Sequence, residues 1–228
     1  MSFSFDGVDD YFTNAPGAIG NTQMTFFIAM KPTSYGEQSR AHLITQGTGA
    51  DSSPRVNWLF GDGYSGVYAN SIRLTLHHAT APAIWTTPYD PAQLGKWQSA
   101  AFSLDHALNA NDPTMYFNGQ STPMTRQGSP SGAWDADGLD FYFGNNSGQS
   151  RTFLGLINTL AVWTRVLAPS EHALIHYCGV RKVLRGLAFW YRFSSGMGFN
   201  FSGSPLSLGG AGPTYVGGAE GDRLATGG

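Results

Sequence analysis

Short runs of alternating or aromatic residues, separated about every ten residues by turn-forming dipeptides, dominate this sequence. In the clearest run, residues 71–77, three aliphatic side chains alternate with polar ones. A period of two is typical of a half-buried β-strand. Many short strands at this spacing predict an all-β sandwich or barrel. Other expected strands are residues 3–5, 25–30, 42–45, 56–60, 97–104, 115–117, 140–144, 153–162 and 187–193.

One segment instead has the features of a helix. Pro169 stands where proline is favoured as the first helical residue, and Glu171 falls in the first turn, where the helix dipole favours a carboxylate. With Gly179 as the end, the pattern predicts a helix over residues 169–178. Cys178 is the only cysteine, which excludes an intrachain disulfide, and at the apolar end of this helix we expect a buried thiol.

The composition changes after residue 193. The preceding residues carry the strand and helix patterns, whereas residues 194–228 are rich in Gly and Ser and poor in charge. Such a stretch buries little apolar surface by itself. We therefore expect one domain over residues 1–193 and a C-terminal arm over residues 194–228.

Charge and hydropathy exclude two classes of partner. Only 12% of the residues are charged, the net charge is −2, and no run of Lys or Arg exists. This argues against nucleic acid, whose binding needs a basic surface. No apolar stretch approaches the roughly 18 residues that span a bilayer, so no membrane partner is expected. The N-terminus lacks the regions of a signal peptide, which predicts synthesis and folding in a cytoplasm.

Five segments, in order, resemble the laminin-G-like, concanavalin-A-like jelly-roll family. They are FDGVDDY (residues 5–11), MTFFIAMKP (24–32), WQSAAFSLD (97–105), MYFNG (115–119) and the closing segment 143–167. The resemblance implies an all-β fold, a two-sheet antiparallel jelly-roll sandwich, with one short helix near the C-terminal end of the domain. It does not fix a function, because this fold hosts lectins, adhesion modules, enzymes and virion proteins. LAFWYRF (187–193) and the Gly-rich end also resemble virion proteins of tailed phages.

Catalytic patterns are missing from the sequence. The glucanases of this fold use Glu-x-Asp-x-x-Glu on a strand, because glycoside hydrolysis needs two carboxylates a few ångströms apart. The glutamates here are Glu37, Glu171 and Glu220, and none has that setting. There is also no Gly-x-Ser-x-Gly elbow, no phosphate loop and no zinc-ligand spacing. We expect no enzyme activity, no catalytic residue and no organic cofactor.

The acidic turn Asp6, Asp9 and Asp10 leaves two interpretations open. Calcium takes six to eight oxygen ligands, and the resemblance implies it because several laminin-G-like and pentraxin-like domains bind it. Asp6-Gly7 is, however, a good turn dipeptide in its own right. A weaker second group is Asp135, Asp137 and Asp140.

Sugar binding would need aromatic faces beside amide groups. Three aromatic residues lie in loop-like stretches, where they would either stack on a sugar or close the ends of the sandwich. The polar segment 145–151 reads as a hairpin connection between two strands, since Asn and Gly tolerate positive φ, and it could form part of a binding rim. The expected glycan or partner contacts are Trp85, Tyr89, Trp134, Asn145, Asn146 and Arg151.

Two functions follow as expectations. The first is a non-enzymatic virion structural protein of a tailed phage, a capsid decoration or tail-associated subunit. It would be made in the host cytoplasm, and its arm would order against copies of itself or other virion subunits, because ordering costs roughly 1–2 kcal/mol per residue. The alternative is a carbohydrate-binding or adhesion module that attaches to surface glycans.

Overall fold

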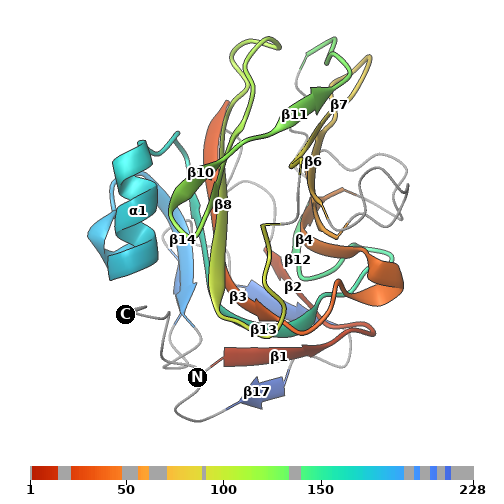
Figure 1. The fold of residues 1–228 in the computed structure, drawn as a ribbon, viewed down its shortest axis with the longest axis vertical. Coiled ribbons are helices and arrows are strands. Elements are labelled where there is room, and N and C mark those ends of the chain that lie inside the picture. The colour runs from red at the N-terminus through yellow and green to blue at the C-terminus, as the bar shows by residue number, and fades with distance from the viewer. Residues whose placement is uncertain are drawn as a thin grey trace.

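The computed structural model describes residues 2–14, 22–47, 56–61, 71–88, 91–133 and 140–192, together with the backbone of 198–200, 206–209 and 214–216. These residues form two antiparallel sheets packed face to face, with one α-helix outside one of them (Figure 1). The predicted fold class is therefore confirmed. No helix among the described residues is long and apolar enough to cross a membrane.

The first sheet carries the helix. Its described strands run in the order β10 (Gln120–Thr122), β9 (Thr114–Phe117), β8 (Gln98–Asp105), β3 (Gln23–Pro32), β13 (Leu154–Trp163), β1 (Ser2–Asp6) and β17 (Thr214–Val216). Strand β14 (Leu187–Arg192) also pairs with β13, and β15 (Gly198–Asn200) pairs with β14. Strand β13 thus has β3 on one side, and on the other it pairs first with β1 and then with β14.

The second sheet closes the sandwich. Its described strands run in the order β11 (Thr125–Gln127), β7 (Ala83–Thr86), β6 (Ile72–Leu76), β5 (Val56–Phe60), β4 (Ala41–Gln46), β12 (Phe141–Phe143), β2 (Tyr11–Asn14) and β16 (Leu206–Gly209). Aromatic rings fill the space between the sheets: Phe102 of the first sheet stacks on Phe26 and meets Trp58 of the second edge-on, with ring centroids 4.8 and 5.0 Å apart. A 3₁₀ turn, η1 (Glu37–Ser39), precedes β4.

Strand β3 shows why the first sheet needs a helix. All its residues from Met24 to Met30 are buried, whereas a sheet open to water on one face shows alternating exposure. Phe26, Ile28 and Met30 belong to the core between the sheets. Phe27 and Ala29 belong to a second apolar cluster with Ile175 of the helix. The helix therefore covers apolar residues that the sandwich leaves on its outer face (Figure 1).

The helix α1 (Pro169–Cys178) has the predicted bounds and is followed by the 3₁₀ turn η2 (Val180–Lys182). Gly179 ends it with φ 85°, in the left-handed region that suits glycine. The prediction of a buried Cys178 is wrong, because its side chain is exposed at the border of a cavity beside the helix end.

The predicted hairpin at residues 145–151 is also wrong. Strand β12 pairs with β2 and β4 in the second sheet, whereas β13 lies in the first. The segment is therefore a crossover between the sheets. The Asn118-Gly119 hairpin is confirmed: it joins β9 to β10, and both residues have positive φ, 50° and 76°.

The arm contributes backbone to both sheets. Strand β15 pairs with β14, β16 extends the second sheet beside β2, and β17 extends the first sheet beside β1. These parts of residues 194–228 thus pair with the chain's own domain.

Candidate functional site

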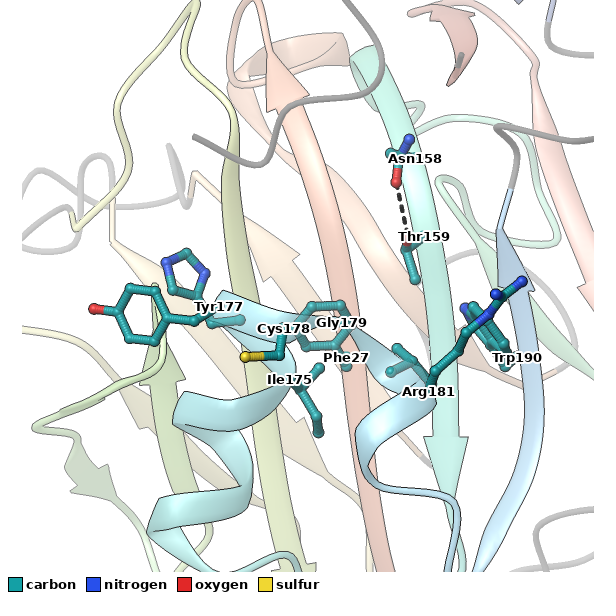
Figure 2. A pocket seen from close by; sticks show the side chains of 11 residues that line it. Phe27, Asn158, Thr159, Ile175, Tyr177, Cys178, Gly179, Arg181 and Trp190 are labelled. Carbon is teal, nitrogen blue, oxygen red and sulfur yellow. Dashed lines mark hydrogen bonds between the residues drawn. The ribbon is translucent and has the colours of Figure 1, made fainter. Parts of the chain in front are cut away.

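A cavity of about 220 Å³ lies beside the C-terminal end of α1 (Figure 2). Its described walls come from four parts of the fold: the α1–η2 junction, the middle of β13, β14 and Phe27 of β3. Aromatic rings and polar groups both face it, a combination typical of small-ligand sites. The described lining residues are Phe27, Asn158, Thr159, Ile175, His176, Tyr177, Cys178, Gly179, Val180, Arg181 and Trp190.

A β-bulge in β13 brings two polar residues to this cavity. The register of β13 on β3 shifts between Ile157 and Thr159, so no β3 residue lies directly opposite Asn158 in the strand register. Ile157 and Leu160 both belong to the core between the sheets, which leaves Asn158 and Thr159 together on the helix side. A strand without a bulge would place only one of two consecutive side chains there. The Thr159 hydroxyl donates to Asn158 Oδ1 at 2.7 Å.

Tyr177 and His176 lie at one end of the cavity. Figure 2 shows the Tyr177 ring at the opposite end from Arg181 and Trp190. Tyr177 is 64% exposed, and its ring meets the His176 ring edge-on, with centroids 4.6 Å apart. His176 Nδ1 lies 2.8 Å from Ser99 Oγ, and burial lowers the pKa of its imidazole. An exposed aromatic ring thus stands on a helix end that is tied to β8.

Arg181 and Trp190 form the other end. The guanidinium carbon of Arg181 lies 5.5 Å from the centroid of the Trp190 ring. Such a cation–π contact orients the planar guanidinium. Trp190 is only 5% exposed. Its ring contacts Arg181 and leaves little surface on which a ligand could stack.

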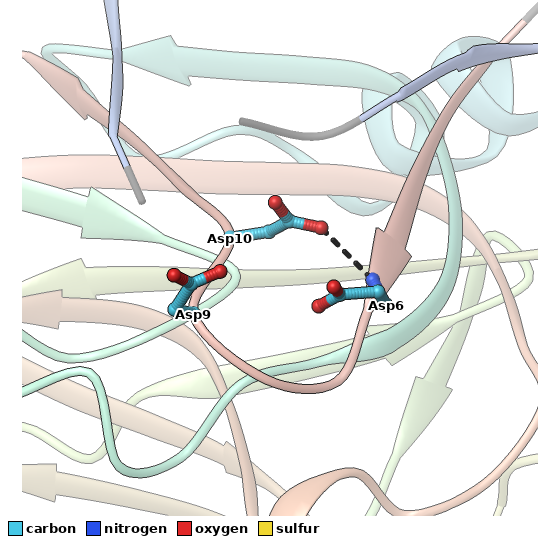
Figure 3. Close-up of side chains that lie close together, drawn as sticks. All are labelled: Asp6, Asp9 and Asp10. Atoms are coloured by element: carbon cyan, nitrogen blue, oxygen red, sulfur yellow. Dashed lines mark hydrogen bonds between the residues drawn. The ribbon is translucent and has the colours of Figure 1, made fainter. Parts of the chain in front are cut away.

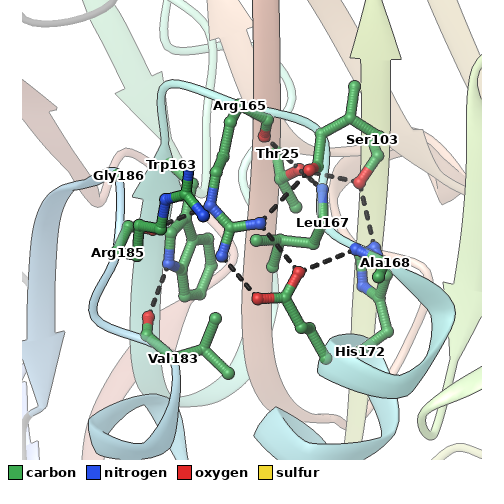
Figure 4. A network of polar contacts seen from close by, with 12 residues as sticks. Thr25, Ser103, Trp163, Arg165, Leu167, Ala168, His172, Val183, Arg185 and Gly186 are labelled. Carbon is green, nitrogen blue, oxygen red and sulfur yellow. Dashed lines mark hydrogen bonds and ion pairs between the residues drawn. The ribbon is translucent and has the colours of Figure 1, made fainter.

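A chain of hydrogen bonds fixes α1 against the first sheet (Figure 4). Thr25 Oγ1 donates to the carbonyl of Arg165 at 2.8 Å, so its one proton is used. Ser103 Oγ, 2.7 Å away, must then donate to Thr25. His172 Nε2, 2.9 Å from Ser103, must in turn carry a proton and donate to it.

This proton assignment bears on catalysis. In a serine nucleophile pair the histidine accepts the hydroxyl proton, whereas His172 Nε2 here is a donor. The His172 ring also stacks on Tyr116 at 3.7 Å and is 2% exposed. Burial lowers its pKa to about 4, so the imidazole is neutral near pH 7. The contact between Ser103 and His172 therefore attaches the helix and does not present a nucleophile.

Arg165 and Glu171 complete the attachment (Figure 4). Their bidentate ion pair has N–O distances of 2.6 and 2.7 Å. Glu171 also accepts from the backbone N–H of Ala168 at 2.8 Å, which satisfies the start of the helix where Ala168 offers no capping side chain. The Arg165 hydrogen bonds lower the Glu171 pKa to about 2.

Of the three aromatic residues predicted to contact a sugar, the structure describes Trp85. Trp85 lies in strand β7 and not in a loop; it is 2% exposed and donates from its indole N–H to Asp112 at 2.8 Å. Its ring is a core group that also meets Arg126. Tyr89 and Trp134 lie outside the described residues.

Asn145 and Asn146 are fully buried and organise the crossover. Asn145 Nδ2 donates to the hydroxyl of Thr152, and Asn146 Oδ1 accepts from the backbone N–H of Ser150. Their side chains hold the loop together and do not face solvent. Arg151 is half-buried and donates to Gln38.

The acidic turn gathers three carboxylates at the end of β1, beginning with its last residue, Asp6 (Figure 3). One oxygen from each of Asp6, Asp9 and Asp10 lies within 4.8 Å of the others. Two hydrogen bonds close the turn: Asp10 Oδ2 accepts from the N–H of Asp6, and Asp6 Oδ1 accepts from the N–H of Val8. Burial, with the neighbouring carboxylates, raises the Asp10 pKa. Both earlier interpretations, a turn and a calcium site, fit this geometry. In the second group Asp135 and Asp137 lie outside the described residues.

Sequence reasoning missed the cavity at the end of α1. The sequence presents residues 175–178 as the apolar end of a helix, a pattern that does not indicate a cavity. A signal existed in the polar pair Asn158 and Thr159, which interrupts an otherwise apolar strand and is typical of a bulge.

Comparisons with known proteins agree with this architecture. A family model described as the concanavalin A-like lectin/glucanases superfamily matches residues 6–171. No curated protein matches the sequence. Solved structures match with low sequence identity, which indicates the fold alone.

Three of these structures illustrate the likeness. A heptameric SAP-like pentraxin from Limulus polyphemus has a TM-score of 0.58 and 13% identity, over 91% of this chain and 94% of that one. A protein from Bacteroides ovatus described as carbohydrate-binding has 0.61 and 15%, over 91% of this chain and 59% of that one. The sialidase module CBM40 of Ruminococcus gnavus, bound to α2,3 sialyllactose, has 0.54 and 15%, over 77% and 97%.

Proposed function

The chain belongs to the concanavalin A-like lectin/glucanase superfamily, and from this premise we propose that it is a non-catalytic glycan-binding module. The proposed binding site is the cavity at the end of α1. Structures of similar fold include proteins described as carbohydrate-binding, which supports the ligand class but not the site.

The cavity itself is the observation that carries the proposal. Sugars present apolar C–H faces and polar hydroxyls, so their sites combine an exposed ring with hydrogen-bonding groups. Tyr177 supplies the ring at one end, and Asn158, Thr159 and Arg181 supply polar atoms. The walls are rigid, because α1 is fixed by the Thr25, Ser103 and His172 chain.

The chemistry of the described residues favours binding over hydrolysis. No Asp or Glu is among the described residues that line the cavity, and a glycosidase of the usual kind needs two such groups. The acidic side chain closest in sequence to it, Glu171, is held by Arg165 with a lowered pKa, which is unsuited to a general acid near neutral pH.

No feature of the described residues favours the virion role. One argument for it was an arm that orders against another subunit. The described backbone of the arm pairs with the chain's own strands, which removes that support.

The test is a glycan array probed with the whole chain, with and without calcium. We expect binding to a limited set of glycans, without release of reducing ends. Tyr177→Ala should weaken binding by roughly two- to tenfold, since an aromatic contact contributes roughly 0.5–1.5 kcal/mol. Leu174→Ala is the matched control, because Leu174 is exposed on the same helix and does not line the cavity.

The single cysteine locates the ligand independently. Cys178 is exposed and lines the cavity, so a bound glycan should slow its alkylation by N-ethylmaleimide. Glycan binding without protection of Cys178 and without an effect of Tyr177→Ala would place the site elsewhere. No binding across the array would contradict the proposed function.

A further inference from the structure

We infer that the cavity at the end of α1 selects acidic sugars, and that the guanidinium of Arg181 binds the sugar carboxylate. This inference rests on the proposed function and adds the ligand class. It follows from the kinds of polar group in the cavity and from the way Arg181 is held.

The charged and polar lining is suited to an anion. Sites for neutral sugars need acceptors as well as donors, because each hydroxyl can do both. The described lining contains no carboxylate, and one of the two lone pairs of the Asn158 carbonyl oxygen is taken by Thr159. Arg181 can only donate. A ligand with concentrated acceptor oxygens satisfies this lining better than one with hydroxyls alone.

Arg181 is the group able to bind a carboxylate strongly. Its planar fork fits two carboxylate oxygens at once, and such charge-assisted hydrogen bonds are about twice as strong as neutral ones. Within the part of the chain that the structure describes, no Asp or Glu pairs with Arg181; its partner is the Trp190 ring. Arg165 differs, since Glu171 already neutralises it.

The surroundings reinforce the charge. Lys182 follows Arg181 in η2, and Arg185 follows three residues later, both exposed. These cations attract an anionic ligand without contacting it, an effect that salt screens. A cavity of about 220 Å³ lies below the roughly 300–1,000 Å³ of sites for drug-sized ligands, which suits one sugar residue better than a whole oligosaccharide. The structure thus favours one acidic residue of a longer glycan.

The experiment compares each acidic glycan with its methyl ester, in which the carboxylate has become an uncharged group. Trigalacturonic acid, a hyaluronan tetrasaccharide and 3′-sialyllactose are each titrated against their own methyl esters by calorimetry. The wild-type chain should bind at least one acid about tenfold more tightly than its ester, consistent with one strong charge-assisted contact. Arg181→Gln should abolish that difference, and Arg181→Lys should retain only part of it.

Lys182→Gln is the matched control, because it makes the same change of charge one residue away, outside the cavity. It should leave the preference for the acid nearly intact. Unfolding curves of the variants show that each is folded. Equal or tighter binding of the esters, or an acid preference that survives Arg181→Gln, overturns the inference. If only neutral glycans bind and protect Cys178, the glycan-binding function stands and the acidic ligand class is wrong.

Discussion

At the scale of single residues, the structure depends on polar side chains that each serve several backbone groups. Thr25 is the clearest example. Its hydroxyl donates a hydrogen bond to the Arg165 carbonyl, and it accepts hydrogen bonds from the backbone N–H of Leu167 and from the Ser103 hydroxyl. A sequence pattern places Thr25 on a strand but does not reveal these contacts, because their partners lie 78 to 142 residues away.

Thr25→Val should therefore destabilise the fold well beyond a surface substitution. The valine keeps the shape but leaves the Leu167 N–H and the Arg165 carbonyl without this partner, at roughly 1–3 kcal/mol for each buried group. Urea unfolding should show a loss of about 2–6 kcal/mol in the free energy of unfolding. Thr33→Val removes an exposed hydroxyl that donates to Leu154 and should change the free energy of unfolding by less than about 0.5 kcal/mol; equal effects would refute the role of Thr25.

Asp10→Asn separates the two interpretations of the acidic turn. The amide keeps an oxygen that accepts from the Asp6 N–H, while the loss of charge relieves the burial and repulsion that raise the Asp10 pKa. If the group is only a turn, the variant should be as stable as the wild type or slightly more so at pH 7, and calcium should shift neither melting temperature. A calcium-dependent rise of the wild-type melting temperature that Asp10→Asn abolishes would instead establish a metal site.

At the scale of elements, the helix was predicted to the residue and the crossover was not. Pro169, Glu171 and Gly179 act locally, so their positions determine where α1 begins and ends. The connection 145–151 depends on which sheet each flanking strand joins, and turn residues such as Asn and Gly suit a hairpin and a crossover equally. The cavity was missed for the same reason, since it needs the register of β13 against β3.

The attachment of α1 to the first sheet should contribute less to the free energy of unfolding in acid. His172 has a folded pKa of about 4, below the ordinary 6.5, so its contribution is complete above pH 6.5 and is lost as the pH falls toward 4. Between pH 7 and pH 5 this one histidine should lower the free energy of unfolding by about 2 kcal/mol. His42 and His106, with pKa values lowered to about 3 by burial, act in the same direction.

His172→Gln isolates the helix contribution. Glutamine can still donate to Ser103 but does not titrate. The variant should lose about 2 kcal/mol less than the wild type between pH 7 and pH 5, as measured by urea unfolding followed by tryptophan fluorescence. An unchanged pH dependence would mean that His172 is not buried as a neutral ring.

At the scale of the whole molecule, both sheets are extended by strands from the C-terminal arm. Strands β16 and β17 pair with β2 and β1, which would otherwise be edges with unpaired N–H and C=O groups. Unpaired edges invite association with other chains. The arm thus has a role within one chain.

A chain ending at residue 192 should be less stable and should self-associate more than the full chain. Light scattering after size-exclusion chromatography, at several concentrations, measures the second effect. A chain ending at residue 216 keeps β15, β16 and β17 and serves as the control. If both shortened chains match the full one in mass and melting temperature, pairing by the arm contributes little.

The bulge at Asn158 has a consequence for which changes of length the chain tolerates. The bulge absorbs the extra residue, because Asn158 and Thr159 share the helix side. The regular alternation continues after them: Leu160 and Val162 enter the sandwich, while Ala161 and Trp163 lie under the helix. Deleting Asn158 would leave Thr159 as the single outer residue between Ile157 and Leu160. Both apolar sets would then keep their faces, and the Trp163 indole would still donate to Val183. A deletion between Leu160 and Trp163, where β13 alternates regularly, would instead exchange the inner and outer residues that follow it and misplace members of both apolar clusters.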